Sequence, residues 1–89
     1  MNEKPWSIEI KRRADRDIGR LDRQVRNRVL TAIDKLVVDP EHATGVQKLT
    51  GRPESRLRVG DWRVIFEFDR QAGTLNVLRV LPRGRAYRD

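Results

Sequence analysis

Arginine residues at alternating positions in the C-terminal part of the chain have the right chemistry to act on phosphate groups. They include Arg56, Arg58 and Arg63, followed by Arg79 and Arg83. A guanidinium group is planar, stays charged at physiological pH and can hold a phosphate through two parallel hydrogen bonds. Several such groups directed at one phosphodiester would stabilise the negative charge that develops on its non-bridging oxygens during cleavage. The pattern therefore makes a phosphate polymer the first partner to consider.

The alternation of apolar and polar residues predicts that these arginines share one face of a sheet. A period of two predicts strands at about 55–59, 62–69 and 75–81, joined by tight turns. The side chains expected in the core are Leu57, Val59, Trp62, Val64, Phe66, Phe68, Leu78 and Val80. The arginines then project from the opposite, open face, together with the apolar side chains of Ile65, Val77 and Leu81. Like charges gathered in this way repel, so the arrangement indicates a site for a polyanion.

A solvated sheet face would show the same alternation, because antiparallel sheets often bury only one side. The apolar residues among the arginines favour a covered surface instead, since a patch that is both apolar and basic is typically an interaction site. Trp6 and Trp62 alternate with core residues and are expected to be buried, and His42 is expected to be exposed without a role. Tyr87 lies outside any periodic pattern, so it could either dock onto the domain or face a substrate.

The remaining segments supply the elements that must position this face. Residues 6–10 alternate as a strand, and helical spacing of apolar residues predicts helices at about 13–21 and 22–38, the second ended by Pro40. Residues 41–54 lack periodicity, which indicates a long loop. We therefore expect an α+β fold, in which an N-terminal strand precedes an antiparallel two-helix hairpin packed on one face of an antiparallel sheet, completed by a C-terminal three-stranded meander. Residues 1–89 are expected to form a single domain.

Composition narrows the function classes further. Twenty lysines and arginines, sixteen of them arginine, against thirteen acidic residues give a formal net charge of +7. The absence of cysteine excludes disulfide bonds, thiolate catalysis and cysteine-based zinc sites. We expect no metal ion and no cofactor. No apolar run is long enough for a membrane span or a signal sequence, so we expect a cytoplasmic protein without a membrane partner.

Two segments, 56–66 (RLRVGDWRVIF) and 80–88 (VLPRGRAYR), resemble the signature of the RelE/ParE superfamily of type II toxin–antitoxin toxins. Leu49-Thr50-Gly51 matches the leucine and glycine that usually precede this signature. The resemblance covers the whole chain in length and element order, and it implies a RelE-like fold. For the RelE branch it implies an mRNA interferase, which is a ribosome-dependent endoribonuclease that causes growth arrest and is inhibited by a cognate antitoxin.

Carried over by position, the resemblance implies catalytic roles for Arg56, Arg58, Arg63, Arg83 and Tyr87. Arg63 and Arg83 would contact the scissile phosphate. Arg56 and Arg58 would hold the RNA backbone or stabilise charge, and Tyr87 would orient or protonate a reacting group. The implied reaction is attack of a ribose 2′-OH on the adjacent phosphodiester, which leaves a 2′,3′-cyclic phosphate and a 5′-OH.

The implied partners are messenger RNA on the ribosome, within its 16S ribosomal RNA environment, and an antitoxin that forms a hetero-oligomer with the toxin. We expect Arg79, Arg85 and Arg88 to bind RNA. We expect Ile65, Val77 and Leu81 to bind the antitoxin, through an extended or helical acidic segment that folds on contact.

The general base is not identified by the sequence. Arginine has a pKa above about 12 and is a poor proton acceptor. Some relatives have lysines where this chain has Arg56 and Arg58, and many have a histidine where it has Pro82. The remaining candidate carboxylates are Glu54, Asp61 and Glu67.

Two other functions are compatible with the same fold, because fold does not determine function. One is a ParE-like inhibitor of DNA gyrase without nuclease activity, which would have no use for convergent arginines. The other is a catalytically silent module that binds the ribosome or RNA, with an affinity that falls steeply with salt.

Overall fold

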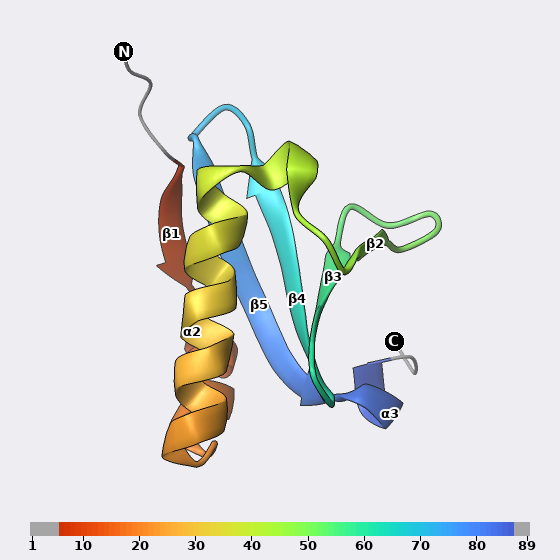
Figure 1. The fold of residues 1–89 in the computed structure, drawn as a ribbon. Helices are drawn as coiled ribbons and strands as arrows, with labels where there is room; N and C mark the ends of the chain where they lie inside the picture. The colour runs from red at the N-terminus through yellow and green to blue at the C-terminus, as the bar shows by residue number, and fades with distance from the viewer. Residues whose placement is uncertain (1–5, 87–89) are drawn as a thin grey trace.

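A five-stranded mixed sheet forms the centre of the computed structural model, which describes residues 6–86. The elements along the chain are β1 (Ser7–Ile10), α1 (Arg12–Gly19), α2 (Arg23–Val38), a 3₁₀ turn η1 (Pro40–His42), β2 (Val46–Lys48), β3 (Ser55–Val59), β4 (Trp62–Asp69), β5 (Thr74–Pro82) and α3 (Arg83–Ala86). The strand order is β1-β5-β4-β3-β2, which places the first and last strands side by side (Figure 1).

The α+β layout and the C-terminal meander are confirmed. The second helix begins where expected, because the Asp22 side chain caps it by accepting a hydrogen bond from the Val25 N–H at 3.0 Å. The predicted loop at 41–54 instead contains η1 and the short strand β2. The antiparallel assignment was wrong for one strand, because β1 runs parallel to β5. A parallel pair requires a long crossover connection, and the helices supply it here.

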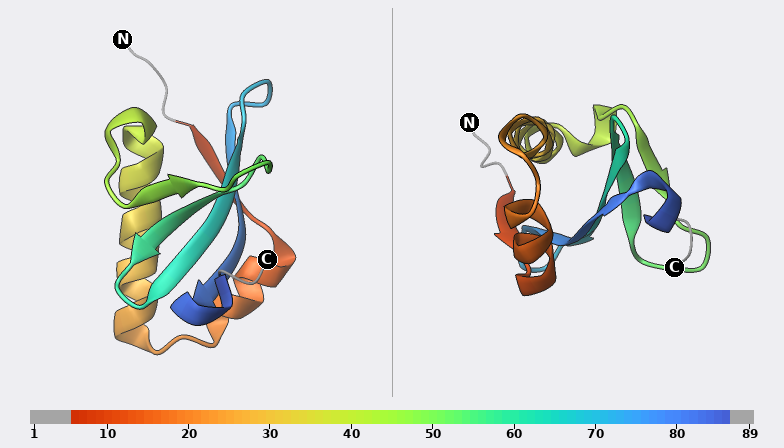
Figure 2. Two further views of the ribbon diagram at one scale, coloured as in Figure 1. Left: turned by 90° about the vertical axis from the view of Figure 1, so that its right-hand side faces the viewer. Right: turned by 90° about the horizontal axis from the view of Figure 1, so that it is seen from below.

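The core lies between α2 and the sheet, where apolar side chains of both are removed from water. Val29 and Ile33 of α2 are at most 1% exposed, as are Val64 and Phe66 of β4. Burying one such side chain contributes about 2 kcal/mol. Seen from below, α2 lies over one face of the sheet and α1 lies beside β5, against which it packs (Figure 2). The opposite face of the sheet is therefore left for function.

A β-bulge at Leu78 determines which side chains of β5 reach the core. Ile65 pairs with Arg79 and Phe66 pairs with Val77, so Leu78 has no partner on β4. The extra residue shifts by one position which side chains of β5 face the core. Val77 therefore lies in the core, at 0% exposure. Leu78 lies on the outer face instead. The predicted positions of Val77 and Leu78 were therefore wrong, because a run of adjacent apolar residues fits either phase equally well.

Asp17 of α1 caps the part of β5 that β1 does not cover. Its Oδ2 accepts a hydrogen bond from the Val80 N–H at 2.9 Å and another from Arg79 Nε at 2.8 Å, and its Oδ1 accepts one from Arg79 Nη2 at 3.2 Å. Burial alone would raise the pKa of Asp17, but the hydrogen bonds from Arg79 and Val80 outweigh it and hold the pKa below the usual aspartate value. The pair joins α1 to the last strand.

We expect Asp17→Asn to lower the free energy of unfolding by about 2 kcal/mol at neutral pH, because it removes the carboxylate charge of the Asp17–Arg79 ion pair. The folded-state pKa of Asp17 is depressed, so its stabilisation is present above the unfolded-state pKa and is lost as the pH falls through the folded-state value. Urea unfolding at neutral pH and at about pH 2 measures both effects, and the variant and wild type should converge in acid. Asp34→Asn, on the exposed side of α2, is the control and should change little. An equal loss at both pH values would contradict this role.

Candidate functional site

Three of the predicted arginines line one cavity on the outer face of the sheet. Arg56, Arg58 and Arg63 surround a volume of about 380 Å³, which Gly45, Val46 and Gln47 close on the β2 side. Arg58 lies directly opposite Arg63 in the β3–β4 pair, and Arg56 lies opposite Ile65. Strand alternation thus directs three cationic side chains from neighbouring strands into one space, which we call the arginine cavity.

The arginine cavity is less open than the sequence predicts. Arg56 is 6% exposed and Arg63 is 9% exposed, whereas Arg58 is exposed. Arg63 Nη1 donates hydrogen bonds to the carbonyl oxygens of Gly60 at 3.0 Å and Trp62 at 2.9 Å. The β3–β4 turn therefore fixes this guanidinium before any ligand arrives, which is the condition for stabilising a developing charge without reorganisation.

Gly45 shapes the edge of the arginine cavity, although the sequence assigns it only to a loop. Its φ of +78° lies in the left-handed region that favours glycine, and its carbonyl accepts a hydrogen bond from the Arg58 N–H at 2.9 Å. A Cβ there would lie 3.5 Å from the carbonyl oxygen of Arg58. The glycine itself was the available signal, because glycine is common where backbones approach closely.

Arg83 begins α3 at the end of the sheet where the β3–β4 turn lies. Pro82 pairs with Trp62, and the Arg83 N–H donates to the Asp61 carbonyl at 2.9 Å. Arg83 is exposed at this end of the sheet, which Arg58 and Arg63 also occupy. Of the other predicted residues, Tyr87, Arg88 and the side chain of Arg85 lie outside the part of the chain that the structure describes.

A second cavity of about 420 Å³ lies over β4 and β5 and combines apolar with charged walls. Its apolar wall consists of Leu49, Ile65, Leu78 and Leu81, and its charged rim consists of Arg13, Arg52, Glu54 and Arg79. We call it the outer groove. It adjoins the arginine cavity, because Ile65 pairs with Arg56 and Leu81 pairs with Arg63.

The outer groove receives two of the three residues predicted to bind an antitoxin. Ile65 and Leu81 line it, whereas Val77 lies in the core and its place is taken by Leu78. The sequence could not reveal this exchange, since it follows from the bulge. Arg79 also lines the groove, but it forms an ion pair with Asp17 and is not among the residues of the arginine cavity.

Of the three candidate carboxylates, Glu54 is the one with a buried oxygen atom that forms no hydrogen bond within the described part of the chain. Its Oε1 is buried and has no hydrogen-bond partner among residues 6–86. Asp61 is exposed at the β3–β4 turn, and Glu67 is half-buried on β4. None of these three carboxylates lines the arginine cavity.

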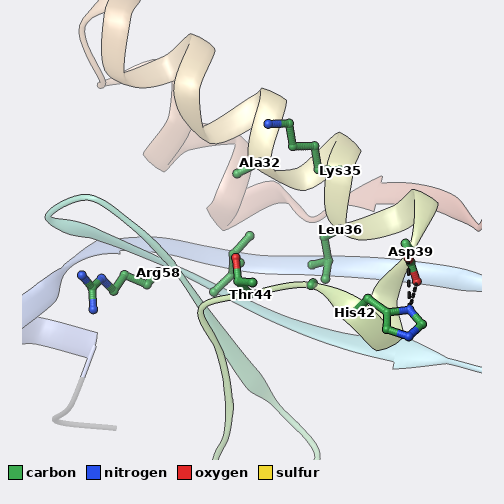
Figure 3. A pocket seen from close by; sticks show the side chains of 9 residues that line it. Ala32, Lys35, Leu36, Asp39, His42, Thr44 and Arg58 are labelled. Atoms are coloured by element: carbon green, nitrogen blue, oxygen red, sulfur yellow. Dashed lines mark hydrogen bonds and ion pairs between the residues drawn. The ribbon is translucent and has the colours of Figure 1, made fainter.

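A third cavity, of about 330 Å³, lies between α2 and β3 (Figure 3). His42 and Asp39 stand at one end of it and Arg58 at the other. His42 is exposed, as predicted, and its Nδ1 lies 2.9 Å from Asp39 Oδ1. The hydrogen bond to Asp39 raises the pKa of His42. Arg58 lines both this cavity and the arginine cavity, whereas His42 and Asp39 line only this one, on the helical side of the sheet.

Comparison with known proteins shows the family to which the chain belongs. A family model described as the ParE toxin of the type II toxin–antitoxin system parDE matches residues 8–87. No curated protein sequence is significantly similar to the chain. In the described part of the chain, no helix has the length and apolar character needed to cross a bilayer.

Solved structures of RelE toxins share the fold. The chain is 26% identical to archaeal RelE in the RelE–RelB complex from Pyrococcus horikoshii OT3, with a TM-score of 0.79 over 92% of this chain and 99% of that one. It is 17% identical to a mutant RelE of E. coli in the free state, with a TM-score of 0.75 over 94% and 90% of the two chains. It is 21% identical to a chain of the RelBE2 toxin–antitoxin complex from Mycobacterium tuberculosis, with a TM-score of 0.63 over 89% of this chain and 92% of that one.

The family match extends from β1 to beyond α3, and the sheet, helices and element order are those of RelE. The chain therefore belongs to the ParE toxin family of type II toxin–antitoxin systems, within the RelE/ParE superfamily, and has the fold of RelE.

Proposed function

We propose that this toxin is a ribosome-dependent endoribonuclease that cleaves messenger RNA by attack of a ribose 2′-OH on the adjacent phosphodiester. The observation that carries the proposal is the arginine cavity, in which Arg56, Arg58 and Arg63 surround one space. A protein that acted only by binding gyrase would gain nothing from concentrating like charges there. A phosphodiester would supply the opposite charge.

The proposed chemistry follows from the positions of the guanidinium groups. The 2′-oxygen forms a new bond to phosphorus while the bond from phosphorus to the 5′-oxygen breaks, which gives a 2′,3′-cyclic phosphate and a 5′-OH. The 2′-OH loses a proton, and the departing 5′-oxygen gains one. Arg63, already fixed by two backbone carbonyls, would bind a non-bridging oxygen, and Arg58 opposite it would bind the other. Arg83 does not line the arginine cavity, and it would reach the phosphate from the start of α3, just after β5.

The arginines do not act as the proton acceptor in this scheme, since each keeps its proton below about pH 12. Their contribution is electrostatic. The acceptor must be another group, supplied either by this chain or by the ribosomal site that holds the message. Dependence on the ribosome is thus a natural consequence of an arginine cavity that no described carboxylate lines.

We expect the double variant Arg63→Ala with Arg83→Ala to abolish growth arrest and ribosome-dependent cleavage. Loss of one charge-stabilising donor typically lowers the rate by about 10²-fold to 10³-fold, and two losses compound. Arg70→Ala is the control, because Arg70 is exposed in the β4–β5 turn at the other end of the strands. Primer extension on a translated message and colony counts after induction measure both effects. A double variant that is still fully toxic would remove the assignment.

The location of the cuts distinguishes the proposed activity from the alternatives. Ends that map within translated codons support messenger RNA cleavage. DNA breaks with intact messages would indicate gyrase poisoning, as expected of a ParE-like inhibitor. Growth arrest with neither kind of break would indicate a silent ribosome-binding module.

We further propose that a cognate antitoxin covers the outer groove. The archaeal relative and the mycobacterial relative are both seen in complexes with an antitoxin. The groove offers apolar side chains inside a rim that is mainly basic, on a chain with a formal charge of +7. An acidic, partly apolar segment would complement it, and such a segment would also shield the adjoining arginine cavity from RNA.

Alanine substitutions at the neighbouring residues 77 and 78 test whether the antitoxin binds the outer groove. We expect Leu78→Ala to weaken antitoxin binding by roughly tenfold with little effect on stability, because Leu78 lines the groove. Val77→Ala should instead lower the free energy of unfolding by about 2 kcal/mol, because Val77 is 0% exposed. Titration calorimetry with the antitoxin measures the affinity, and urea unfolding of each toxin variant measures the free energy of unfolding. The opposite pattern would mean that the bulge is absent.

A further inference from the structure

Among residues 6–86, Glu54 is the one carboxylate in the rim of the outer groove, and its backbone is fixed on both sides. Its carbonyl accepts a hydrogen bond from the Leu49 N–H at 3.1 Å, which closes the loop between β2 and β3. The next residue, Ser55, begins β3 and pairs with Phe66. Backbone pairing on both sides therefore fixes the main chain at Glu54, and its side chain lines the groove.

The side chain itself is incompletely satisfied. Glu54 Oε1 is buried without a hydrogen-bond donor, and no ion pair of Glu54 is found among residues 6–86. A buried acceptor without a partner typically costs about 1–3 kcal/mol, and a charged one costs more. Most buried polar groups are paired, so an exception calls for an explanation. The residue as a whole is only half-buried, so a partner in the groove can supply the missing donor when the carboxylate turns toward it.

We propose that Glu54 receives a lysine or arginine side chain of the cognate antitoxin, and that this pairing determines which antitoxin the toxin accepts. The inference rests on the proposed binding of an antitoxin in the outer groove. The cationic head would donate to Glu54, while its aliphatic stem would lie against Leu49 and Ile65. A single basic residue within an acidic segment is thus the expected signature of the partner.

A protein partner fits this group better than RNA does. A carboxylate in the rim repels a phosphate backbone, whereas a cationic side chain binds it with charge-assisted hydrogen bonds. Removing one member of a buried ion pair is strongly destabilising, so the pair would discriminate against antitoxins that lack the cation. The surrounding arginines would attract most acidic segments, and Glu54 would select among them.

The sign of the effect separates this pairing from general electrostatics. Glu54→Gln makes the formal net charge of +7 more positive by one unit. Long-range attraction to an acidic partner would then become stronger, and binding would tighten. A specific pairing requires the reverse, namely an affinity loss of roughly thirtyfold or more. The same variant removes the charge from a half-buried side chain whose Oε1 has no donor among the described residues, so the toxin alone should be at least as stable as wild type.

Calorimetric titration of the full-length toxin with its cognate antitoxin tests the proposal, with Glu54→Gln beside two matched variants. Glu41→Gln in η1 makes the same charge change at an exposed site and should leave the affinity unchanged or slightly higher. Leu78→Ala reports on the groove independently of Glu54. Thermal unfolding of each toxin variant without antitoxin verifies that it is folded.

The expected result is weaker binding of Glu54→Gln, with normal or raised stability and an unaffected Glu41→Gln control. If Leu78→Ala weakens binding but Glu54→Gln does not, the pairing is wrong while the docking surface stands. If neither variant weakens binding, the docking surface itself is wrong. Unchanged antitoxin affinity together with altered cutting of messenger RNA would assign the carboxylate to RNA, and would overturn the proposal.

A charge exchange provides a second test. Glu54→Lys should abolish binding of the wild-type antitoxin. An antitoxin in which the pairing lysine or arginine is replaced by glutamate should restore binding to this variant. Replacing each basic residue of the antitoxin in turn identifies the partner, and failure of every replacement to restore binding would contradict a direct pair.

Discussion

The pairing of β4 with β5, including its bulge at Leu78, is the constraint on which the rest of the structure depends. Before the bulge, Leu75 and Val77 lie in the core, and beyond it Val80 does so. The single extra residue lets both segments contribute to one core while Leu78 and Arg79 face outward together. Arg79 then meets Asp17, which ties α1 to the strand. Both the outer groove and the anchoring of α1 therefore follow from one irregularity in one strand.

Strand alternation predicted much of this architecture because most of the chain obeys it. Arg56, Arg58 and Arg63 lie on two regularly paired strands, so their common face could be inferred from parity alone. The bulge could not be inferred, because residues 77 and 78 are both apolar and the sequence does not show which of them faces the core. The short strand β2 was also missed, since three exposed residues leave no periodic signal. The parallel position of β1 depends on contacts across most of the chain, which local patterns do not encode.

The arginine cavity shows how charge and burial are reconciled. Arg56 and Arg63 lie almost entirely out of water, yet charged groups are seldom buried without compensation. Arg63 obtains part of that compensation from the carbonyl oxygens of the β3–β4 turn. The turn thus positions one guanidinium without cancelling its positive charge, because the acceptors are neutral carbonyl groups.

The parallel pair of β1 and β5 has a consequence for how the toxin becomes functional after synthesis. Ser7 pairs with Thr74, so the sheet joins residues from opposite ends of the described chain. β5 also lies between β1 and β4, so both of these strands depend on it for pairing. Pairings of such long range make folding slow, because a large loop must close before they form. The nascent chain therefore cannot complete its sheet until β5 has left the ribosomal exit tunnel, which delays the appearance of the folded toxin relative to its own translation.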